Sequence, residues 1–410
     1  MLKRSILLLI CLSLLGLMLV GCTEDEIEQA KDHLQNNRPT TERNKVTLNF
    51  YIMSASEISE TAVRAMEERF NIYTEAKYRT RVKFFIYSPE AYAAALQSKF
   101  TAVEDAGMPD TLPAATDAYP ELLDGQLDIF LNISDEMLRD NVLKGRLTDL
   151  TAYMTGTYHN LSRDKTPTSI APVLYNNSYT KIATYISAED ANPTIVQQHY
   201  GVPNNTIIGE YTYLVVDKAQ ADLCYLENSF PLDGTANLTA VTAARTQLTT
   251  FLTNQKLTVA DYIQEVTGDY GTRHQYDSSE YYVTIIKKPE LTYKEIVSSM
   301  FCISAYTANA DRAMEIIYEL NTSAELHTIL QYGVRDVTYT VDVENQTITK
   351  IADAPYTYDM NIRHTGNLFC IYPAASDGYT HIRFEEGYLQ NKDVTAPTVP
   401  QINIYPPAGD

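Results

Sequence analysis

The chain has no tryptophan and few cysteines or histidines: 5 and 7 among its 410 residues. None of the cysteines stands in a CxxC or CxxH spacing, so the sequence predicts neither a zinc site nor a disulfide framework. Cys224, Cys302 and Cys370 lie far apart and are odd in number. We expect them to be free, buried thiols.

Common catalytic motifs are also missing. The sequence contains no HExxH, G-x-S-x-G, Walker A or GxGxxG pattern, which excludes the best-known signatures of metalloproteases, serine hydrolases and nucleotide-binding enzymes. Acidic pairs such as Glu67-Glu68 and Glu385-Glu386 are typical of solvated faces in so acidic a chain. A glycosidase would need two carboxylates facing each other across a cleft, which a sequence does not show. We predict that the chain is not an enzyme and has no catalytic residue, cofactor or metal.

Positive charge is scarce. The 32 lysines and arginines stand against 52 acidic residues, a formal net charge of −20. Such a surface repels nucleic acid and anionic lipid headgroups. We therefore expect no nucleic-acid partner.

The N-terminus has the features of an export signal. Lys3 and Arg4 precede an apolar run at residues 6–20, which is shorter than the roughly 20 residues that span a bilayer. The run ends in LVGC at residues 19–22 and resembles the lipobox of bacterial lipoproteins. The resemblance implies a signal peptide at residues 1–21, cleavage before Cys22 and lipid attachment to the Cys22 sulfur. The alternative is an ordinary signal peptide with a chance cysteine.

Residues 22–44 are charged and polar, and we interpret them as a lipidated, flexible tether. Two acyl chains at about 0.8 kcal/mol per buried methylene, as in palmitate, are ample for stable anchoring. We expect the protein at the cell membrane, lipid-anchored and facing the extracellular side.

The first half of the body alternates strands and helices. Period-2 patterns predict strands at residues 46–52, 82–87 and 127–131. Helical spacing predicts helices after each, the first starting from an S-x-x-E capping box at residues 54–57 and the last covering 137–147. This order favours a parallel sheet with helical crossovers.

In such sheets ligands bind beyond the carboxyl ends of the strands. Ser54 and Asn132 stand at two of these ends and are candidate ligand-binding residues. An equally good interpretation is that they belong to helix caps.

The second half contains further elements. We predict strands at 211–216 and 281–287, a helix at 259–266, and a helix at 308–320 with Asn309 as its cap. Another helix starts at Ser323 and ends at Gly333. A hairpin follows, with strands at 337–341 and 348–351 around Glu344 and Asn345.

Three stretches resemble the lipid-anchored extracellular solute-binding proteins, family 1, of bacterial ABC importers, which mostly serve carbohydrate uptake. They are the strand–helix–strand at residues 46–87, "YGVPNNTIIGEYTYLVVDKAQAD" at 200–222, and "ISAYTANADRAMEIIYELNTSAELHTILQYGVRDVTYTVD" at 303–342. The resemblance implies an α/β, two-lobed periplasmic-binding-protein-like (type II) fold with strands exchanged between the lobes. Lobe 1 would comprise 45–210 and 295–345, and lobe 2 would comprise 211–294 and 346–410. Many relatives continue in further helices where this chain ends in a proline-rich tail, so either the tail is a variant or lobe 2 is shortened.

The resemblance also implies the function: a monomer that captures a small solute, an oligosaccharide, and delivers it to ABC permease subunits. Glu210 and Tyr211, at the start of the crossing strand, and Ser304 and Tyr306, before a helix, would contact the ligand. Glu210 could instead be a solvated loop acid, and Ser304 and Tyr306 cap and core residues. Because 31 tyrosines must replace tryptophan as sugar-stacking groups, a peptide or an unusual glycan is an alternative ligand. A sensory or adhesive lipoprotein without import is the alternative function.

Overall fold

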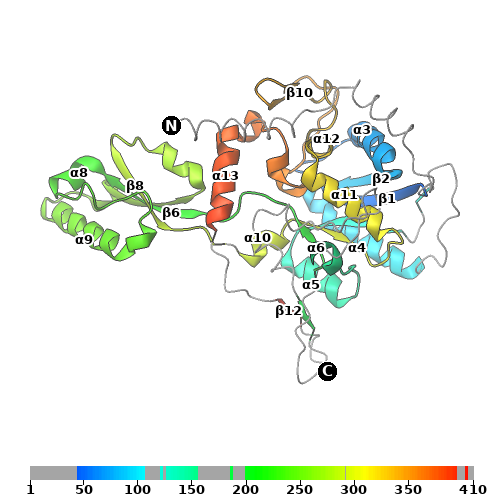
Figure 1. Cartoon of the computed structure of the whole chain (residues 1–410), viewed down its shortest axis with the longest axis horizontal. Coiled ribbons are helices and arrows are strands. Elements are labelled where there is room, and N and C mark those ends of the chain that lie inside the picture. Colours follow the sequence, from blue (N-terminus) through cyan, green and yellow to red (C-terminus); the bar gives the residue numbers. More distant parts are fainter. Residues whose placement is uncertain are drawn as a thin grey trace, which may run out of the picture.

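The structure is a computed structural model that describes residues 44–106, 121–122, 126–155, 185–187, 199–290, 292–394 and 402–404. The predicted signal peptide, Cys22 and all but the last residue of the predicted tether lie outside these ranges. The described chain forms two lobes along its long axis (Figure 1). We call the larger one the large lobe and the one built from residues 211–287 the small lobe.

A five-stranded sheet forms the centre of the large lobe. Its order is β2 (Thr80–Tyr87), β1 (Val46–Met53), β3 (Ile129–Asn132), β9 (Met300–Ile303) and β5 (Val202–Pro203). Strand β1 is parallel to β2 and β3, which confirms the predicted parallel unit. Strand β9 is antiparallel to both β3 and β5. Strand β9 follows the small lobe in the sequence, but its two neighbours, β3 and β5, precede the small lobe.

Helices pack around this sheet and complete one continuous core. They are α3 (Glu60–Tyr78), α4 (Pro89–Ala106), α5 (Asp135–Leu143), α6 (Thr151–Thr155), α10 (Tyr293–Val297), α11 (Ala310–Thr322) and α12 (Ala324–Tyr332). Phe50 lies at the centre, with its ring 5.4 Å from that of Phe84 and 5.1 Å from that of Phe301. These rings come from three different strands, so the core depends on the whole sheet being assembled.

The start of α3 differs from the prediction. The helix begins at Glu60, and its N-cap is Ser59, whose side chain accepts a hydrogen bond from the Ala62 amide. The predicted capping box at residues 54–57 was wrong because the Ser54 hydroxyl donates to the carbonyl oxygens of Ser56 and Tyr87 instead. Ser54 is thereby tied to the end of β2.

The predicted elements from residue 308 to 351 are confirmed. Helix α11 follows Asn309, and α12 is capped by the Ser323 hydroxyl. Gly333 ends α12 with a φ of +89°, a conformation that favours glycine. The hairpin pairs β10 (Tyr339–Asp342) with β11 (Thr347–Lys350).

The small lobe is a three-stranded antiparallel sheet with helices on one face. Strand β6 (Tyr211–Asp217) lies between β7 (Ile263–Gly268) and β8 (Tyr281–Lys287). Alternate residues of β6 face α8 (Lys218–Leu223) and α9 (Leu238–Asn254), where Leu214 and Val216 pack with Leu248. The other face carries tyrosines that pack near η4 (Tyr270–Gln275).

One predicted helix of the small lobe was wrong. Residues 259–266 form a single 3-10 turn, η3 (Val259–Asp261), followed by β7. Ile263 pairs with Val216 of β6, so sheet formation overrides the local helical spacing.

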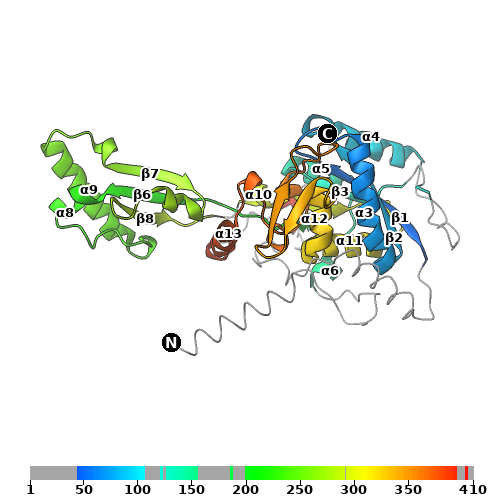
Figure 2. The same cartoon turned by 90° about the horizontal axis from the view of Figure 1, so that it is seen from above.

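Residues 346–394 belong with the large lobe, not with lobe 2 as predicted. They form 3-10 turns η5 (Ile362–His364), η6 (Leu368–Cys370) and η7 (Ala375–Asp377), then α13 (His381–Asp393). Tyr358 and Met360 enter the large-lobe core, and Phe384 of α13 shares a cluster with Tyr332 and Tyr339. Helix α13 lies between the two lobes in both views (Figure 2). Farther along, β12 (Ile402–Ile404) pairs with β4 (Tyr185–Ser187).

The cysteines and helices of the described chain bear on two further expectations. Cys224, Cys302 and Cys370 are free thiols, but only Cys302 is fully buried. Among the described helices, none combines the length and the apolar character that crossing a bilayer requires.

Candidate functional site

Two segments of the described chain connect the lobes, residues 204–210 before β6 and residues 288–290 after β8. They touch at Gly209, whose φ of +65° favours glycine. A Cβ there would lie 2.8 Å from the Cβ of Pro289. The Gly209 amide donates to Glu295 Oε1 (3.1 Å), and its carbonyl accepts from Gln390 Nε2 (2.5 Å). The backbone next to Glu210 is therefore held from three sides.

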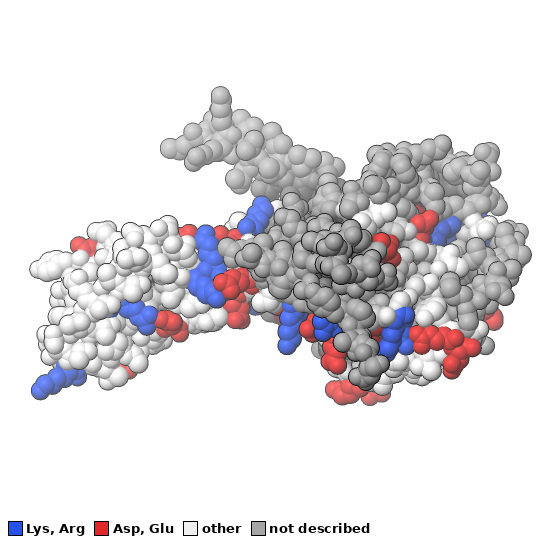
Figure 3. Space-filling view, turned by 90° about the horizontal axis from the view of Figure 1, so that it is seen from below, with Lys and Arg blue, Asp and Glu red and all other residues white. Residues whose placement is uncertain are grey.

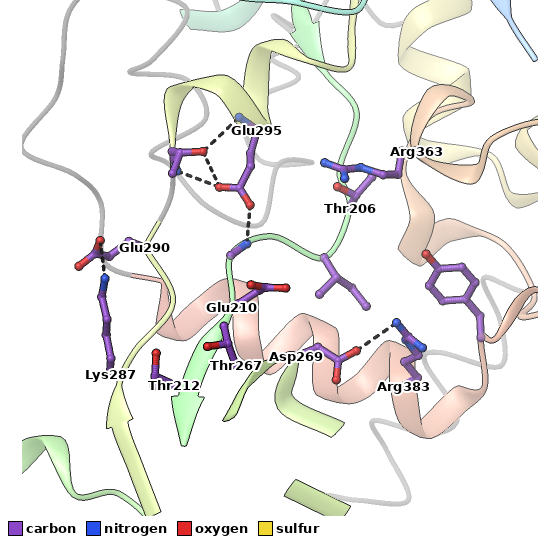
Figure 4. A pocket seen from close by; sticks show the side chains of 14 residues that line it. Thr206, Glu210, Thr212, Thr267, Asp269, Lys287, Glu290, Glu295, Arg363 and Arg383 are labelled. Atoms are coloured by element: carbon purple, nitrogen blue, oxygen red, sulfur yellow. Dashed lines mark hydrogen bonds and ion pairs between the residues drawn. The ribbon is translucent and has the colours of Figure 1, made fainter. Parts of the chain in front are cut away.

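A pocket of about 550 Å³ opens at this junction. This volume is within the range of about 300–1,000 Å³ that small-molecule sites occupy. Its walls come from both lobes, from the connecting segments and from the region before α13 (Figure 4). The lining residues are Thr206, Ile207, Gly209, Glu210, Thr212, Thr267, Asp269, Lys287, Glu290, Thr292, Glu295, Arg363, Tyr379 and Arg383.

Most charged side chains of the pocket have partners inside it. Lys287 pairs with Glu290 at 3.2 Å, and Arg383 pairs with Asp269 at 3.0 Å. Glu295 accepts from the Thr292 amide at 3.1 Å as part of a capping box at the start of α10. These contacts organise the walls.

Apolar and aromatic groups are sparse in this lining. Ile207 is the single aliphatic side chain larger than threonine, and Tyr379 the single aromatic one, among the described lining residues. The Tyr379 phenol can both donate and accept hydrogen bonds, and burial raises its pKa above the ordinary value. The pocket is therefore suited to a ligand with many polar groups.

One face of α13 binds the small lobe and the connecting segments. Arg383, Glu386, Gln390 and Asp393 recur at intervals of 3, 4 and 3, which places them on one side of the helix. We call these four residues the α13 contact face. Charged side chains gather at this junction, whereas few lie on the far end of the small lobe (Figure 3).

Each residue of the α13 contact face has a partner across the junction. Besides the Arg383–Asp269 pair, Glu386 Oε1 lies 2.5 Å from His274 Nε2, and Gln390 accepts from the Tyr270 amide at 2.8 Å.

Asp393 completes the face. It accepts from the Tyr211 hydroxyl (3.1 Å) and from Lys288 Nζ (2.8 Å). The hydrogen bond to Asp393 raises the pKa of Lys288, and burial raises that of Tyr211. Helix α13 thus links the ends of the small-lobe strands to the rest of the molecule.

Of the six predicted ligand-binding residues, Glu210 lines the pocket. Its role in binding stays a prediction. Tyr211, next to it, is buried, with its hydroxyl on Asp393.

The other four predicted residues lie elsewhere in the large lobe. Ser54 is buried at the end of β1, and the Asn132 amide donates to the Val297 carbonyl at 2.6 Å. The Ser304 oxygen accepts from the Tyr306 amide at 3.1 Å, and the Tyr306 hydroxyl donates to Glu104 at 3.2 Å. None of the four caps a described helix, because the N-caps of α3, α5 and α11 are Ser59, Ser134 and Asn309. Ser54, Asn132 and Ser304 are buried in the large lobe, and the role of all four in ligand binding stays a prediction.

Several pocket residues were missed from the sequence. Arg363 and Tyr379 lie in a stretch of 3-10 turns that has no periodic pattern, and Asp269 follows a strand that was predicted as a helix. A signal existed only for α13, where polar residues recur at helical spacing. Within the described ranges, no group of three or more His, Cys, Asp or Glu side chains is placed to hold a metal ion.

No protein-family model and no curated protein sequence matches the chain. Solved structures do. The N-glycan transport solute binding protein (NgtS) from Streptococcus pneumoniae superposes with a TM-score of 0.50 at 14% identity, over 86% of this chain and 84% of that chain. This chain has the fold of a solute-binding protein. The predicted two-lobed α/β class is therefore confirmed.

Two further structures are similar at lower scores. NgtS in complex with Man1GlcNAc gives a TM-score of 0.48 at 13% identity, covering 86% of this chain and 84% of that one. An extracellular solute-binding protein family 1 member from Alicyclobacillus acidocaldarius gives 0.43 at 11% identity, covering 90% of both chains. At 14% identity, the superposition on NgtS shows the fold alone.

Proposed function

We propose that this protein is a lipid-anchored extracellular solute-binding protein that captures a small polar solute, an oligosaccharide, and delivers it to an ABC importer. The observation that carries the proposal is the polar pocket at the junction, to which both lobes contribute walls. The similarity in fold to an N-glycan transport solute binding protein supports it. The solute leaves unchanged, because the proposed role is capture and not catalysis.

The geometry suggests how capture works. Thr212, Thr267 and Lys287 belong to the small lobe, whereas Arg363 and Tyr379 belong to the region packed on the large lobe. A solute that touches both groups binds best when the lobes are close, so it shifts the population toward a closed form. That form would then dock on the permease.

The anchor follows from the sequence alone. If Cys22 carries the lipid, the wild-type protein should sediment with membranes. Cys22→Ser should release it or leave an uncleaved precursor. A wild-type protein found unacylated in the cytoplasm would contradict the proposed location.

Solute capture can be tested by thermal unfolding of the purified protein against a panel of oligosaccharides and peptides. A ligand at a hundredfold excess over its Kd should stabilise the protein by about 2.7 kcal/mol. Mass spectrometry should recover the solute intact, and a cleaved product would indicate a hydrolase. If no member of the panel changes the unfolding temperature, the capture function is wrong.

A peptide ligand is the second candidate, and one observation favours it. Tyr379 is the single aromatic residue in the described lining, whereas sugar sites commonly combine polar contacts with stacking on aromatic faces. The same panel separates the two, since it contains both classes. Uptake of a labelled ligand by cells would separate import from sensing or adhesion.

A further inference from the structure

We propose that the solute is dipolar, presenting an ammonium group to Glu210 and a carboxylate to Arg363. The inference rests on the proposed function and goes beyond it by assigning the charge of the ligand. It comes from the way in which the pocket's own charges are distributed.

The lining holds charges of both signs in nearly equal number. Four acidic and three basic side chains face the pocket, and two pairs, Lys287–Glu290 and Arg383–Asp269, neutralise each other. Glu295 is engaged by the Gly209 and Thr292 amides. This leaves one carboxylate, Glu210, and one guanidinium, Arg363, with no hydrogen-bonded or ion-paired partner among the described residues.

Both remaining charges extend from a fixed backbone. Glu210 follows Gly209, which is held by Glu295 and Gln390. Arg363 lies in η5, where its amide donates to the Asn361 side chain at 3.0 Å and its carbonyl accepts from the Ser299 hydroxyl.

The ends of these two side chains reach into the pocket from opposite sides (Figure 4). Both residues are exposed in this structure. The cost of desolvating their charges therefore arises only when a solute covers them.

That cost selects the ligand. A neutral solute would cover one unpaired carboxylate and one unpaired guanidinium with hydroxyl groups only, and an ion with a single charge would compensate one of them. A solute with an ammonium and a carboxylate compensates both through charge-assisted hydrogen bonds, which are the stronger kind. The two source classes are a short peptide with free termini and an oligosaccharide containing a free amino sugar and an acidic sugar.

The experiment uses matched probes and isothermal titration calorimetry on the purified protein. The peptide arm compares trialanine with its N-acetyl and C-amide forms. The sugar arm compares a glucosamine–glucuronic acid disaccharide with its N-acetyl and methyl ester forms. Maltotriose and N,N′-diacetylchitobiose are the neutral probes. We expect the uncapped compound of one arm to bind, and each cap to weaken it about tenfold to a hundredfold.

The variants assign each charge to its residue. Glu210→Gln should remove the penalty for capping the amino group and leave the penalty for capping the carboxylate. Arg363→Gln should do the reverse. Glu57→Gln and Arg64→Gln make the same charge changes on exposed residues outside the pocket and should keep both penalties.

Two results overturn the inference in different ways. Neutral probes that bind as tightly as the uncapped compounds, or penalties that persist in Glu210→Gln and Arg363→Gln, would refute the dipolar ligand and leave solute capture standing. If neither the neutral nor the dipolar probes bind, solute capture fails together with the inference.

Discussion

The two lobes are stabilised in different ways. The large lobe has one extended core that joins its sheet, its helices and the segment around Tyr358 and Met360. The small lobe has two smaller clusters on opposite faces of a three-stranded sheet, one under α8 and α9 and one formed by tyrosines near η4. The second cluster adjoins the α13 contact face through the Tyr211–Asp393 hydrogen bond.

The two lobes therefore have different roles. The large lobe supplies a stable body, because removing any part of a continuous core disturbs the whole. The small lobe contacts the rest of the chain through the connecting segments and through polar pairs with α13, so we expect these contacts to set its orientation. The pocket lies between them, where a change in orientation alters the distance between its walls.

The largest effect should come from the cores. Phe50→Ala in the large lobe should destabilise by about 4 kcal/mol, and Leu248→Ala in the small lobe by about 3 kcal/mol, because each opens a cavity at a fully buried site. Urea unfolding gives the totals, and hydrogen exchange gives the location. Leu248→Ala should raise exchange in the small lobe alone. An equal rise in hydrogen exchange in the large lobe would mean that the two cores unfold as one unit.

The second-largest effect on stability should come from a substitution at the contact between the connecting segments. Gly209→Ala should cost about 2–3 kcal/mol and weaken solute binding, because an alanine there is strained at a φ of +65° and meets Pro289 at 2.8 Å. Gly145→Ala is the matched control, since Gly145 has the same φ but no atom within 4 Å of the added Cβ. It should cost only about 1–2 kcal/mol. Identical losses in unfolding free energy would show that the close approach has no effect.

Acidification should lower the stability of the large lobe through a buried histidine. His327 of α12 is fully buried, and burial lowers its pKa to about 3. Below pH 6.5 the His327 side chain is protonated in the unfolded chain but stays neutral in the folded chain. The free energy of unfolding therefore falls as the pH drops from 6.5 toward 3. At pH 5 the contribution of His327 to this loss is about 2 kcal/mol.

The measurement compares unfolding free energies at pH 7 and pH 5. His327→Gln should show a smaller pH dependence than the wild type by about 2 kcal/mol. His381→Gln is the control on an exposed histidine and should keep the full dependence. A variant at residue 327 with unchanged pH dependence would refute the assignment to His327.

The smallest effect on stability should come from the α13 contact face. Arg383→Gln removes a pair whose side chains are 46% and 30% exposed, so solvent screening limits the loss to about 0.5–1 kcal/mol. The larger consequence should be a looser small lobe, seen by small-angle scattering as a broader distribution of interlobe distances. Arg245→Gln, which breaks a pair with Glu265 inside the small lobe, should leave that distribution unchanged. If Arg383→Gln also leaves it unchanged, α13 does not set the orientation.

Local patterns were a good guide wherever an element could be recognised from its own residues. The alternation in β1 and β6, the caps at Ser323 and Gly333, and the hairpin after α12 all depend on neighbours within a few positions. The prediction for β7 was wrong because its strand state comes from pairing with β6, about 50 residues earlier in the chain. Ser54 and Asn132, which the sequence placed either at a ligand or in helix caps, donate hydrogen bonds to backbone carbonyls of Tyr87 and Val297, residues distant in the chain.

The sequence by itself determined the acidic charge, the lipobox-like cysteine, the alternation of strands and helices, and the carboxylate at the start of the crossing strand. Only the tertiary structure decided that residues 346–394 pack on the large lobe, that α13 lies between the lobes, and that Arg363 and Glu210 share one pocket. The physical reason is distance along the chain. Period and capping act between residues a few positions apart, whereas Glu210 and Arg363 are about 150 positions apart and meet only because the core and the connecting segments bring them together.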